Sequence, residues 1–282
     1  MFSILIANYN NGRFFKDCYE SIIAQTNVEW EAIVVDDNST DDSIEMIAKI
    51  IKDDPRFKFA KNEENKGCGY TKNKCVHLAA GEILAFVDPD DTIKPEALEL
   101  MLEAHKTNPG ISLVHSNFFY CNQELEVQTI FDRAETVHIN NRFINLNASV
   151  NHFASFKKSF YERTTGIDAT LQRAVDQDLY LKLSETGPFY FINQPLYNYR
   201  IHNKGISTSK PDQAFYWYLK VIMKAEERRM INLEDEVAEL LNRSDPNNLQ
   251  INLANPRYLI LAMGRAFRKS PVKFLKKLFV NR

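Results

Sequence analysis

The sequence has few cysteines, and their spacing fits neither a disulfide framework nor a zinc site. There are four among 282 residues, and none of them forms a C-x-x-C pair. We therefore expect free thiols in a reducing cytoplasm.

Other absences exclude further classes of protein. No apolar run approaches the ~18 residues that cross a bilayer, and the amino terminus lacks the basic segment of a signal peptide. The net charge of −2 gives no basic field for nucleic acid. With 44% hydrophobic residues, 19 Phe and 12 Tyr, the chain has ample material for a core. We expect a globular protein that is made and kept in the cytoplasm.

The first 116 residues alternate short apolar runs with segments of helical periodicity. Strands are predicted at residues 2–7, 30–35, 57–60, 82–87 and 111–116, and helices at 12–25, 44–51 and 73–80. One more helix is predicted with Pro95 at its first position, and Thr40 is predicted to cap the helix at 44–51. Alternating strands and helices indicate an α/β fold with a mostly parallel sheet and right-handed crossovers.

Beyond residue 117 the pattern is less regular. A helix is predicted from Val175 to Leu183 and an extended segment over residues 189–199, and from Gln213 onward the pattern is helical.

Acidic residues follow two of the predicted strands. One strand runs into Asp36 and Asp37, and another into Asp88, Asp90 and Asp91. Side chains two apart in extended chain share a face, so Asp88 and Asp90 can converge while Asp91 points elsewhere. Acids also begin ordinary turns, but two clusters at neighbouring strand ends favour a ligand site. An acidic crevice that takes a phosphorylated ligand needs a divalent cation, Mg²⁺ or Mn²⁺, as a bridge.

Four segments together form a specific pattern: residues 6–10 (IANYN), 34–41 (VVDDNSTD), 65–73 (NKGCGYTKN) and 81–91 (GEILAFVDPDD). In this order they resemble the family 2 glycosyltransferases, and the resemblance covers roughly residues 2–207. It implies the GT-A fold, in which a Rossmann-like nucleotide-binding half precedes an acceptor half. It also implies transfer of a sugar from a nucleotide-sugar with inversion.

The resemblance implies a nucleotide-sugar site at the strand ends. Ala7, Tyr9 and Asp37 would hold the nucleoside, with Tyr9 against the base and Asp37 accepting a hydrogen bond from it. Asp88 would approach the ribose or the donor sugar. Lys72 stands where the family often has Arg.

The resemblance also implies a metal site. Asp90, the last acid of the D-x-D, would bind Mn²⁺ or Mg²⁺. Residues 199–202 (YRIH) resemble the family's Y-R-x-H segment, so His202 would complete the metal or diphosphate site and Arg200 would bind the nucleotide-sugar. A lone histidine is also often structural.

Asp176 is predicted to be the catalytic base. Residues 174–179 (AVDQDL) resemble the family's E-D segment, with Val175 in place of the Glu, and Asp176 matches the base. Helical positions two apart lie ~200° apart, so Asp176 and Asp178 cannot both face one pocket. The alternative is that Asp176 only caps the helix.

These residues predict an inverting, metal-dependent glycosyltransferase. Its donor would be a nucleotide-diphosphate sugar, a UDP-sugar by family frequency. Its acceptor would be a hydroxyl of a glycan or lipid-linked glycan, as in the synthesis of a cell-surface polysaccharide or lipopolysaccharide.

Two alternative functions stay open. Residues 88–92 also spell the D-x-D-x-T of aspartyl-nucleophile phosphatases, with Asp88 as nucleophile and Asp90 as acid, although that motif normally lies on the first strand. Val175 suggests an inactive nucleotide-sugar-binding module, although Asp176 is present.

The predicted domains are a catalytic domain, residues 1–210, and a helical extension, residues 211–282. Within the first, residues 1–116 would bind the nucleotide-sugar and residues 117–210 the acceptor.

The carboxyl-terminal tail is basic. Residues 257–282 contain eight of the 35 Lys and Arg and no Asp or Glu, interleaved with apolar side chains. A basic amphipathic helix can lie on an anionic membrane surface, so we expect a peripheral protein on the inner face of the membrane. The alternative is a tail packed on the catalytic domain.

Overall fold

The computed structural model describes residues 1–131, 134, 150–203 and 211–230. The chain divides into two compact units, Met1–Ala214 and Phe215–Arg282. The sheet and the candidate site lie in the first unit.

Four parallel strands form one half of a nine-stranded sheet, in the order β3-β2-β1-β4. They are β1 (Phe2–Asn8), β2 (Trp30–Asp36), β3 (Phe57–Lys61) and β4 (Ile83–Phe86). Almost every residue of β1 and β2 is buried, as expected where helices cover both faces of a parallel sheet. The four strands predicted here and their parallel arrangement are confirmed.

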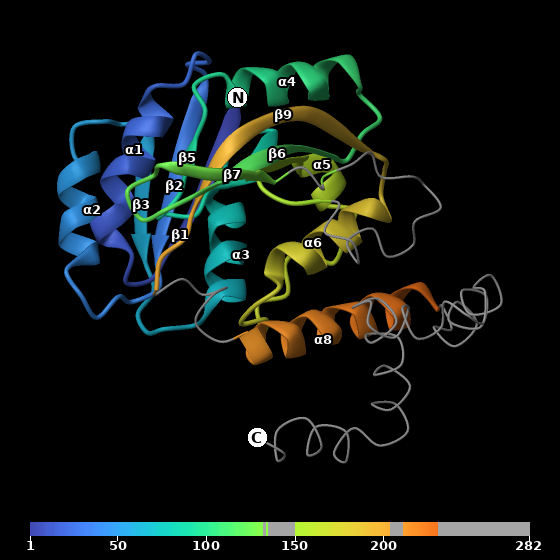
Figure 1. Cartoon of the computed structure of the whole chain (residues 1–282). Coiled ribbons are helices and arrows are strands. Elements are labelled where there is room, and N and C mark those ends of the chain that lie inside the picture. Colours follow the sequence, from blue (N-terminus) through green and yellow to red (C-terminus); the bar gives the residue numbers. More distant parts are fainter. Residues whose placement is uncertain (132–133, 135–149, 204–210, 231–282) are drawn as a thin grey trace. The chain divides into compact units, whose positions relative to one another are not determined.

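Three helical segments connect the strands of this half: η1 (Gly12–Phe14) with α1 (Phe15–Ile23), α2 (Ser43–Ile51) and α3 (Cys68–Leu78). Helix α4 (Ala97–Thr107) follows and leads into the second half of the sheet. Helices α1 and α2 lie on one side of β1, β2 and β3, and α3 lies on the other (Figure 1). This arrangement places the loops after β1, β2 and β4 at one edge of the sheet, where parallel strands present their carboxyl ends.

Two helix starts differ from the sequence-based expectation. The residue that caps α2 is Asp42 and not Thr40. Thr40 is tied to the loop after β1 instead, because its backbone N–H donates to Asn10 Oδ1 at 2.9 Å and its hydroxyl accepts from Asn10 Nδ2 at 3.2 Å. Pro95 precedes Glu96, the cap of α4, and so lies outside the first helical turn. Contacts between distant segments outweigh the local capping preferences here.

Helix α3 begins at Cys68 and not near residue 73. Gly67 has a φ of 89°, a conformation that favours glycine, and turns the chain into the helix. A Cβ on Gly69 would lie 2.5 Å from the carbonyl oxygen of Asp168, so only glycine fits at this crossing. Glycine normally weakens a helix prediction, which explains the late start expected from the sequence. The earlier start places Lys72 within the helix.

The second half of the sheet is mixed. It contains β5 (Thr92–Ile93), β6 (Leu113–Cys121), β7 (Val127–Phe131), β8 (Ala154–Lys157) and β9 (Phe189–Arg200), with α5 (Lys158–Tyr161) and α6 (Val175–Ser184) between β8 and β9. Strand β8 pairs antiparallel with both β4 and β6. The strand expected at residues 111–116 therefore exists as β6 and runs in the direction of β4, but β8 separates the two.

The long strand β9 completes the sheet. It runs parallel to β6 and antiparallel to β5. Its carboxyl end therefore returns to the edge where β4 ends, and it carries Tyr197 and Arg200 to the loop after β4.

Helix α8 (Pro211–Arg229) lies within the segment predicted to be helical. The basic tail, residues 257–282, lies outside the described residues. Among the helices that the structure describes, none is long and apolar enough to cross a membrane.

Candidate active site

The loop after β4 carries Asp88, Asp90 and Asp91, which have different surroundings. Asp91 is buried and accepts hydrogen bonds from the Tyr197 hydroxyl and the Arg200 backbone N–H, both at 2.7 Å. It therefore anchors the loop to β9 and is not available to a ligand. Asp88 keeps 34% of its side chain exposed. The Asp91 backbone N–H donates to the Asp88 carbonyl oxygen at 3.1 Å, so residues 88–91 form a turn beyond β4 and not the extended segment expected from the sequence.

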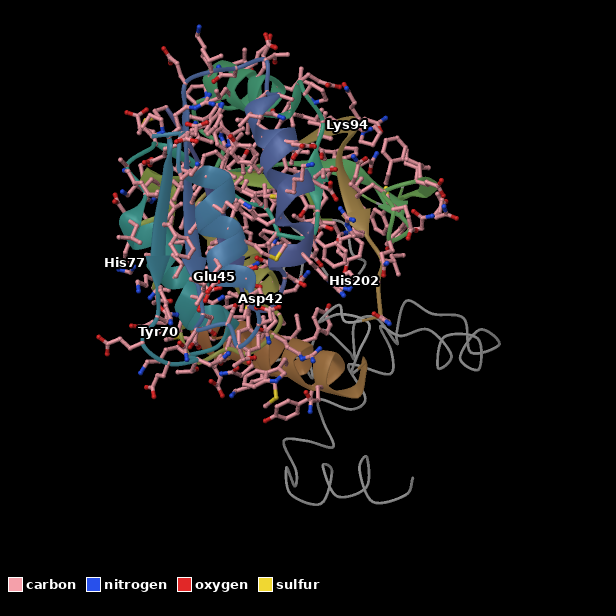
Figure 2. All side chains as sticks on the ribbon, turned by 90° about the vertical axis from the view of Figure 1, so that its left-hand side faces the viewer. Asp42, Glu45, Tyr70, His77, Lys94 and His202 are labelled. Atoms are coloured by element: carbon pink, nitrogen blue, oxygen red, sulfur yellow. The ribbon has the colours of Figure 1, made fainter. Side chains whose placement is uncertain are left out.

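Asp90 and His202 lie together although they are far apart in the sequence. Asp90 Oδ2 is 2.8 Å from His202 Nε2, and the imidazole packs on the ring of Phe14 with centroids 4.7 Å apart. His202 follows β9, on the opposite side of the view from Tyr70 and His77 of α3 (Figure 2).

The Asp90–His202 pair fits a cation that takes few protein ligands. No group of three or more His, Cys, Asp or Glu suited to a metal occurs in the described part of the chain. Mg²⁺ typically takes one or two carboxylates and completes its shell with substrate phosphates and water. A carboxylate oxygen beside an imidazole nitrogen provides such a partial set of ligands.

Arg200 supports the loop and does not face solvent. Its side chain is only 4% exposed. Its guanidinium donates to the carbonyl oxygens of Asp90 and Gln123 at 2.7 and 2.6 Å, and to Asp17 Oδ2 at 2.6 Å. These contacts show that Arg200 holds the loop after β4 in place, and a direct contact between Arg200 and the nucleotide-sugar stays a prediction.

Asp176 lies at the start of α6 and forms an ion pair with Lys72 of α3. Lys72 Nζ is 2.7 and 2.9 Å from the two carboxylate oxygens of Asp176, and 3.8 Å from Asp88 Oδ1. The Lys72 side chain is 5% exposed, against 28% for Asp176 and 34% for Asp88. The ammonium therefore lies behind the two carboxylates, which remain open to a ligand.

The charges of this cluster depend on one another. Burial favours the neutral form of each group, but the carboxylates of Asp176 and Asp88 outweigh it and raise the pKa of Lys72 well above its usual value. Burial likewise acts to raise the pKa of Asp176, but Lys72 and then His152 outweigh it, so that the pKa is lowered. Burial raises the pKa of Asp88, and Lys72 offsets only part of this effect. Asp176 is thus ionised at neutral pH.

Asp178 is directed away from this cluster. It is 1% exposed, and its Oδ2 lies 2.6 Å from Lys182 Nζ. The helical geometry that separated Asp176 from Asp178 is therefore observed. Ala174 occupies the capping position of α6, so Asp176 does not serve as its cap.

The acids after β2 form a rigid part of the site. Asp36 is fully buried and accepts from Asn8 Nδ2 and from Ser39. Asp37 accepts from Asn62 Nδ2 at 2.7 Å and from the backbone N–H of Gly67 at 2.7 Å. It therefore fixes the loop that leads into α3.

The remaining predicted nucleoside residues lie at the same edge. Ala7 precedes the last residue of β1 and lies opposite Val35 of β2. Tyr9 follows β1 and is 43% exposed, which leaves its ring accessible to a base. Sequence reasoning missed the supporting residues Tyr197 and Asp17, because nothing local distinguishes them from core and surface residues.

The fold is that of the GT-A glycosyltransferases. The Staphylococcus aureus protein TarS, residues 1–349 in complex with UDP-GlcNAc, matches with a TM-score of 0.66 and 19% identity over 78% of this chain and 65% of that one. The mannosyltransferase PcManGT from Pyrobaculum calidifontis, in complex with GDP-Man and Mn²⁺, matches with a TM-score of 0.61 and 14% identity over 100% of this chain and 88% of that one.

Sequence comparison assigns the family. Residues 3–165 match the family described as Glycosyl transferase family 2. The chondroitin synthase of Escherichia coli is 31% identical over 228 residues, which are 80% of this chain and 32% of that protein. The hyaluronan synthase of Pasteurella multocida is 28% identical over 74% of this chain and 21% of that protein. The chain belongs to glycosyl transferase family 2, and it spans less than a third of the length of these relatives.

Proposed function

We propose that this chain transfers a sugar with inversion from a nucleoside-diphosphate sugar, in particular a UDP-sugar, to a hydroxyl of a glycan. The observation that carries the proposal is the partly exposed carboxylate of Asp176, held by the buried Lys72 next to Asp88. This places an ionised base beside the acidic loop at the carboxyl edge of the sheet. The family assignment favours this reaction over phosphoester hydrolysis by Asp88.

Asp176 would take the proton of the acceptor hydroxyl as that oxygen attacks the anomeric carbon. One base and one displacement invert the carbon, and no covalent intermediate is required. Lys72 keeps the carboxylate ionised and oriented, because it contacts both oxygens. Asp178 cannot share the role, since it is buried against Lys182.

The loops after β1 and β2 would bind the nucleoside. Tyr9 would lie against the base, beside Ala7. Asp37 would accept a hydrogen bond from a base N–H, and the contacts with Asn62 and Gly67 hold its carboxylate in place for this purpose. The UDP and UDP-GlcNAc complexes of TarS support a uridine donor.

Asp90 and His202 would hold Mn²⁺ or Mg²⁺ together with the diphosphate of the donor. The cation would offset negative charge on the departing diphosphate. The Mn²⁺ complex of PcManGT supports this assignment. Arg200 would act indirectly, because it binds the Asp90 carbonyl oxygen and keeps the loop in shape.

The acceptor would be a growing polysaccharide. The chondroitin and hyaluronan synthases among the relatives support this class of acceptor. The residues that would recognise the acceptor are expected in the second half of the first unit, where α6 and the base lie.

The test is turnover of a panel of donors: UDP-GlcNAc, UDP-GalNAc, UDP-glucose, UDP-glucuronic acid and GDP-mannose, with MnCl₂ and oligosaccharide acceptors. Asp176→Asn keeps the shape of the side chain and removes its basicity, so kcat should fall by about 10²–10⁴-fold with little change in donor affinity. Asp53→Asn is the matched control, because Asp53 lies between α2 and β3, away from the carboxyl ends of the strands, and its side chain is 86% exposed. Donor binding without turnover by the unaltered protein would instead identify a binding module.

A further inference from the structure

His152 reaches the candidate site from a segment in which the sequence showed no motif. It lies two residues before β8, which pairs antiparallel with β4 so that Ser155 is opposite Ala85. The segment before β8 therefore lies near the loop after β4, and the ring of His152 contacts Tyr197, whose hydroxyl binds that loop.

The imidazole of His152 is held by two aromatic rings of β9. It stacks on Tyr197 with centroids 5.1 Å apart and planes 14° apart, and on Tyr199 with centroids 5.6 Å apart and planes 20° apart. The Tyr197 hydroxyl in turn accepts from the Asp88 backbone N–H at 3.2 Å and donates to Asp91 at 2.7 Å. Through these contacts the ring has a defined orientation relative to the loop.

His152 lies within electrostatic range of both Asp88 and Asp176, since after burial and Lys72 it is the next influence on the pKa of each. The side chain is half-buried. Its ring nitrogens have no hydrogen-bond partner within residues 1–131, 150–203 and the other described positions. An imidazole that lies near two partly exposed carboxylates, and that makes no hydrogen bond to the residues the structure describes, is suited to a ligand.

We propose that His152 hydrogen-bonds the sugar that is transferred. This inference rests on the proposed function, in which Asp88 contacts the donor and Asp176 takes the proton of the acceptor. The transferred sugar would lie between these two carboxylates, and His152 stacks on Tyr197, whose hydroxyl contacts the backbone of Asp88. A neutral imidazole offers one donor and one acceptor, which matches a sugar hydroxyl or an acetamido group. His152 is thus a residue that selects the sugar and does not hold the nucleotide.

The test compares the affinities of the full chain for UDP and for UDP-sugars by titration calorimetry with MnCl₂. The probe is the member of the donor panel that binds most tightly relative to UDP. His152→Phe keeps a flat ring on Tyr197 and removes both nitrogens. It should weaken binding of the UDP-sugar on the order of tenfold, with UDP affinity unchanged within about twofold. His152→Gln restores an amide near the position of Nε2 and should recover part of the loss.

His77→Phe is the matched control. His77 is exposed on α3, where its Nδ1 lies 2.8 Å from the carbonyl oxygen of Asn73 in the same helix, away from His202 (Figure 2). Equal weakening of UDP and UDP-sugar in His152→Phe would overturn the proposal, as would unchanged affinity for both. Unchanged donor affinity with slower transfer to an acceptor would also overturn it and would assign His152 to the acceptor. If the unaltered protein binds no nucleotide-sugar, the proposed function itself fails, which is a different result.

Discussion

The two groups of carboxylates at the carboxyl edge of the sheet differ in what neutralises them. Asp36 and Asp37, after β2, are buried and accept hydrogen bonds from neutral donors. Asp88 and Asp176 are partly open and share the ammonium of Lys72. The first pair holds loops in place, with Asp37 in addition proposed to accept a hydrogen bond from the base, and the second leaves ionised oxygens for a ligand. The difference indicates that the strands β1 and β2 supply a rigid frame, whereas the contacts between α3, α6 and the loop after β4 supply the reactive charges.

Of the four experiments described here, the largest effect is expected for Asp90 in the loop after β4, on the affinity for UDP in the presence of Mn²⁺. Asp90→Ala removes the carboxylate beside His202, so the enhancement of UDP binding by Mn²⁺ should be lost, on the order of 10²-fold in affinity. Calorimetry with and without EDTA measures this enhancement. Undiminished turnover of the variant, or of the unaltered protein in EDTA, would contradict a metal at Asp90.

A second experiment tests the shared ammonium. Lys72 is the main group that lowers the pKa of Asp176 against the effect of burial. In Lys72→Met the pKa of Asp176 should rise, so the base becomes protonated at a higher pH than before. The acidic limb of the kcat/KM profile should therefore move to higher pH, and kcat at neutral pH should fall by about tenfold. The pH dependence of turnover between pH 4.5 and 8 provides the measurement, and an unmoved limb would show that Lys72 does not set the ionisation of the base.

Substitution of Asp36, one of the two buried acids after β2, should lower the free energy of unfolding more than it lowers kcat. Asp36→Ala leaves the buried Asn8 amide and the Ser39 N–H without their acceptor. We expect a loss of about 2–4 kcal/mol in the free energy of unfolding, with kcat within about threefold. Urea denaturation measures the loss, and Asp53→Ala serves as control because the Asp53 side chain is 86% exposed and lies outside the helices and strands. Equal stabilities of the two variants would contradict the claim that Asp36 holds the loops after β1 and β2 in place.

The smallest effect on turnover is expected from the tail, residues 257–282, which lies outside the described residues. Each basic residue near an anionic leaflet contributes about 1 kcal/mol to membrane binding. The full chain should float with anionic vesicles at low salt, a chain ending at Asn255 should not, and both should turn over a water-soluble acceptor equally. If both float, or neither does, the tail does not bind the membrane.

The parallel strands β1 to β4 could be predicted from the sequence in detail, whereas the charged side chains of the candidate active site could be predicted only in part. Apolar runs located β1, β2, β3 and β4, and the resemblance picked out Asp90, Asp176 and His202. It did not pair Lys72 with Asp176, and it did not indicate that Arg200 binds Asp17 and the Asp90 carbonyl oxygen. No motif indicated His152, since its neighbours come from β4 and β9.

What the sequence alone determined is local: an apolar run becomes a buried strand because burial removes that run from water, and the acid after it must lie at the strand's end. The tertiary structure decided which charges meet. Lys72 and Asp176 are 104 residues apart, Asp90 and His202 are 112 apart, and Asp17 and Arg200 are 183 apart. The first contact joins α3 to α6, and the other two join the first half of the sheet to the end of β9, which returns to the same edge. The energy of such a pair depends on burial and on the other charges around it, and these exist only once the sheet has closed.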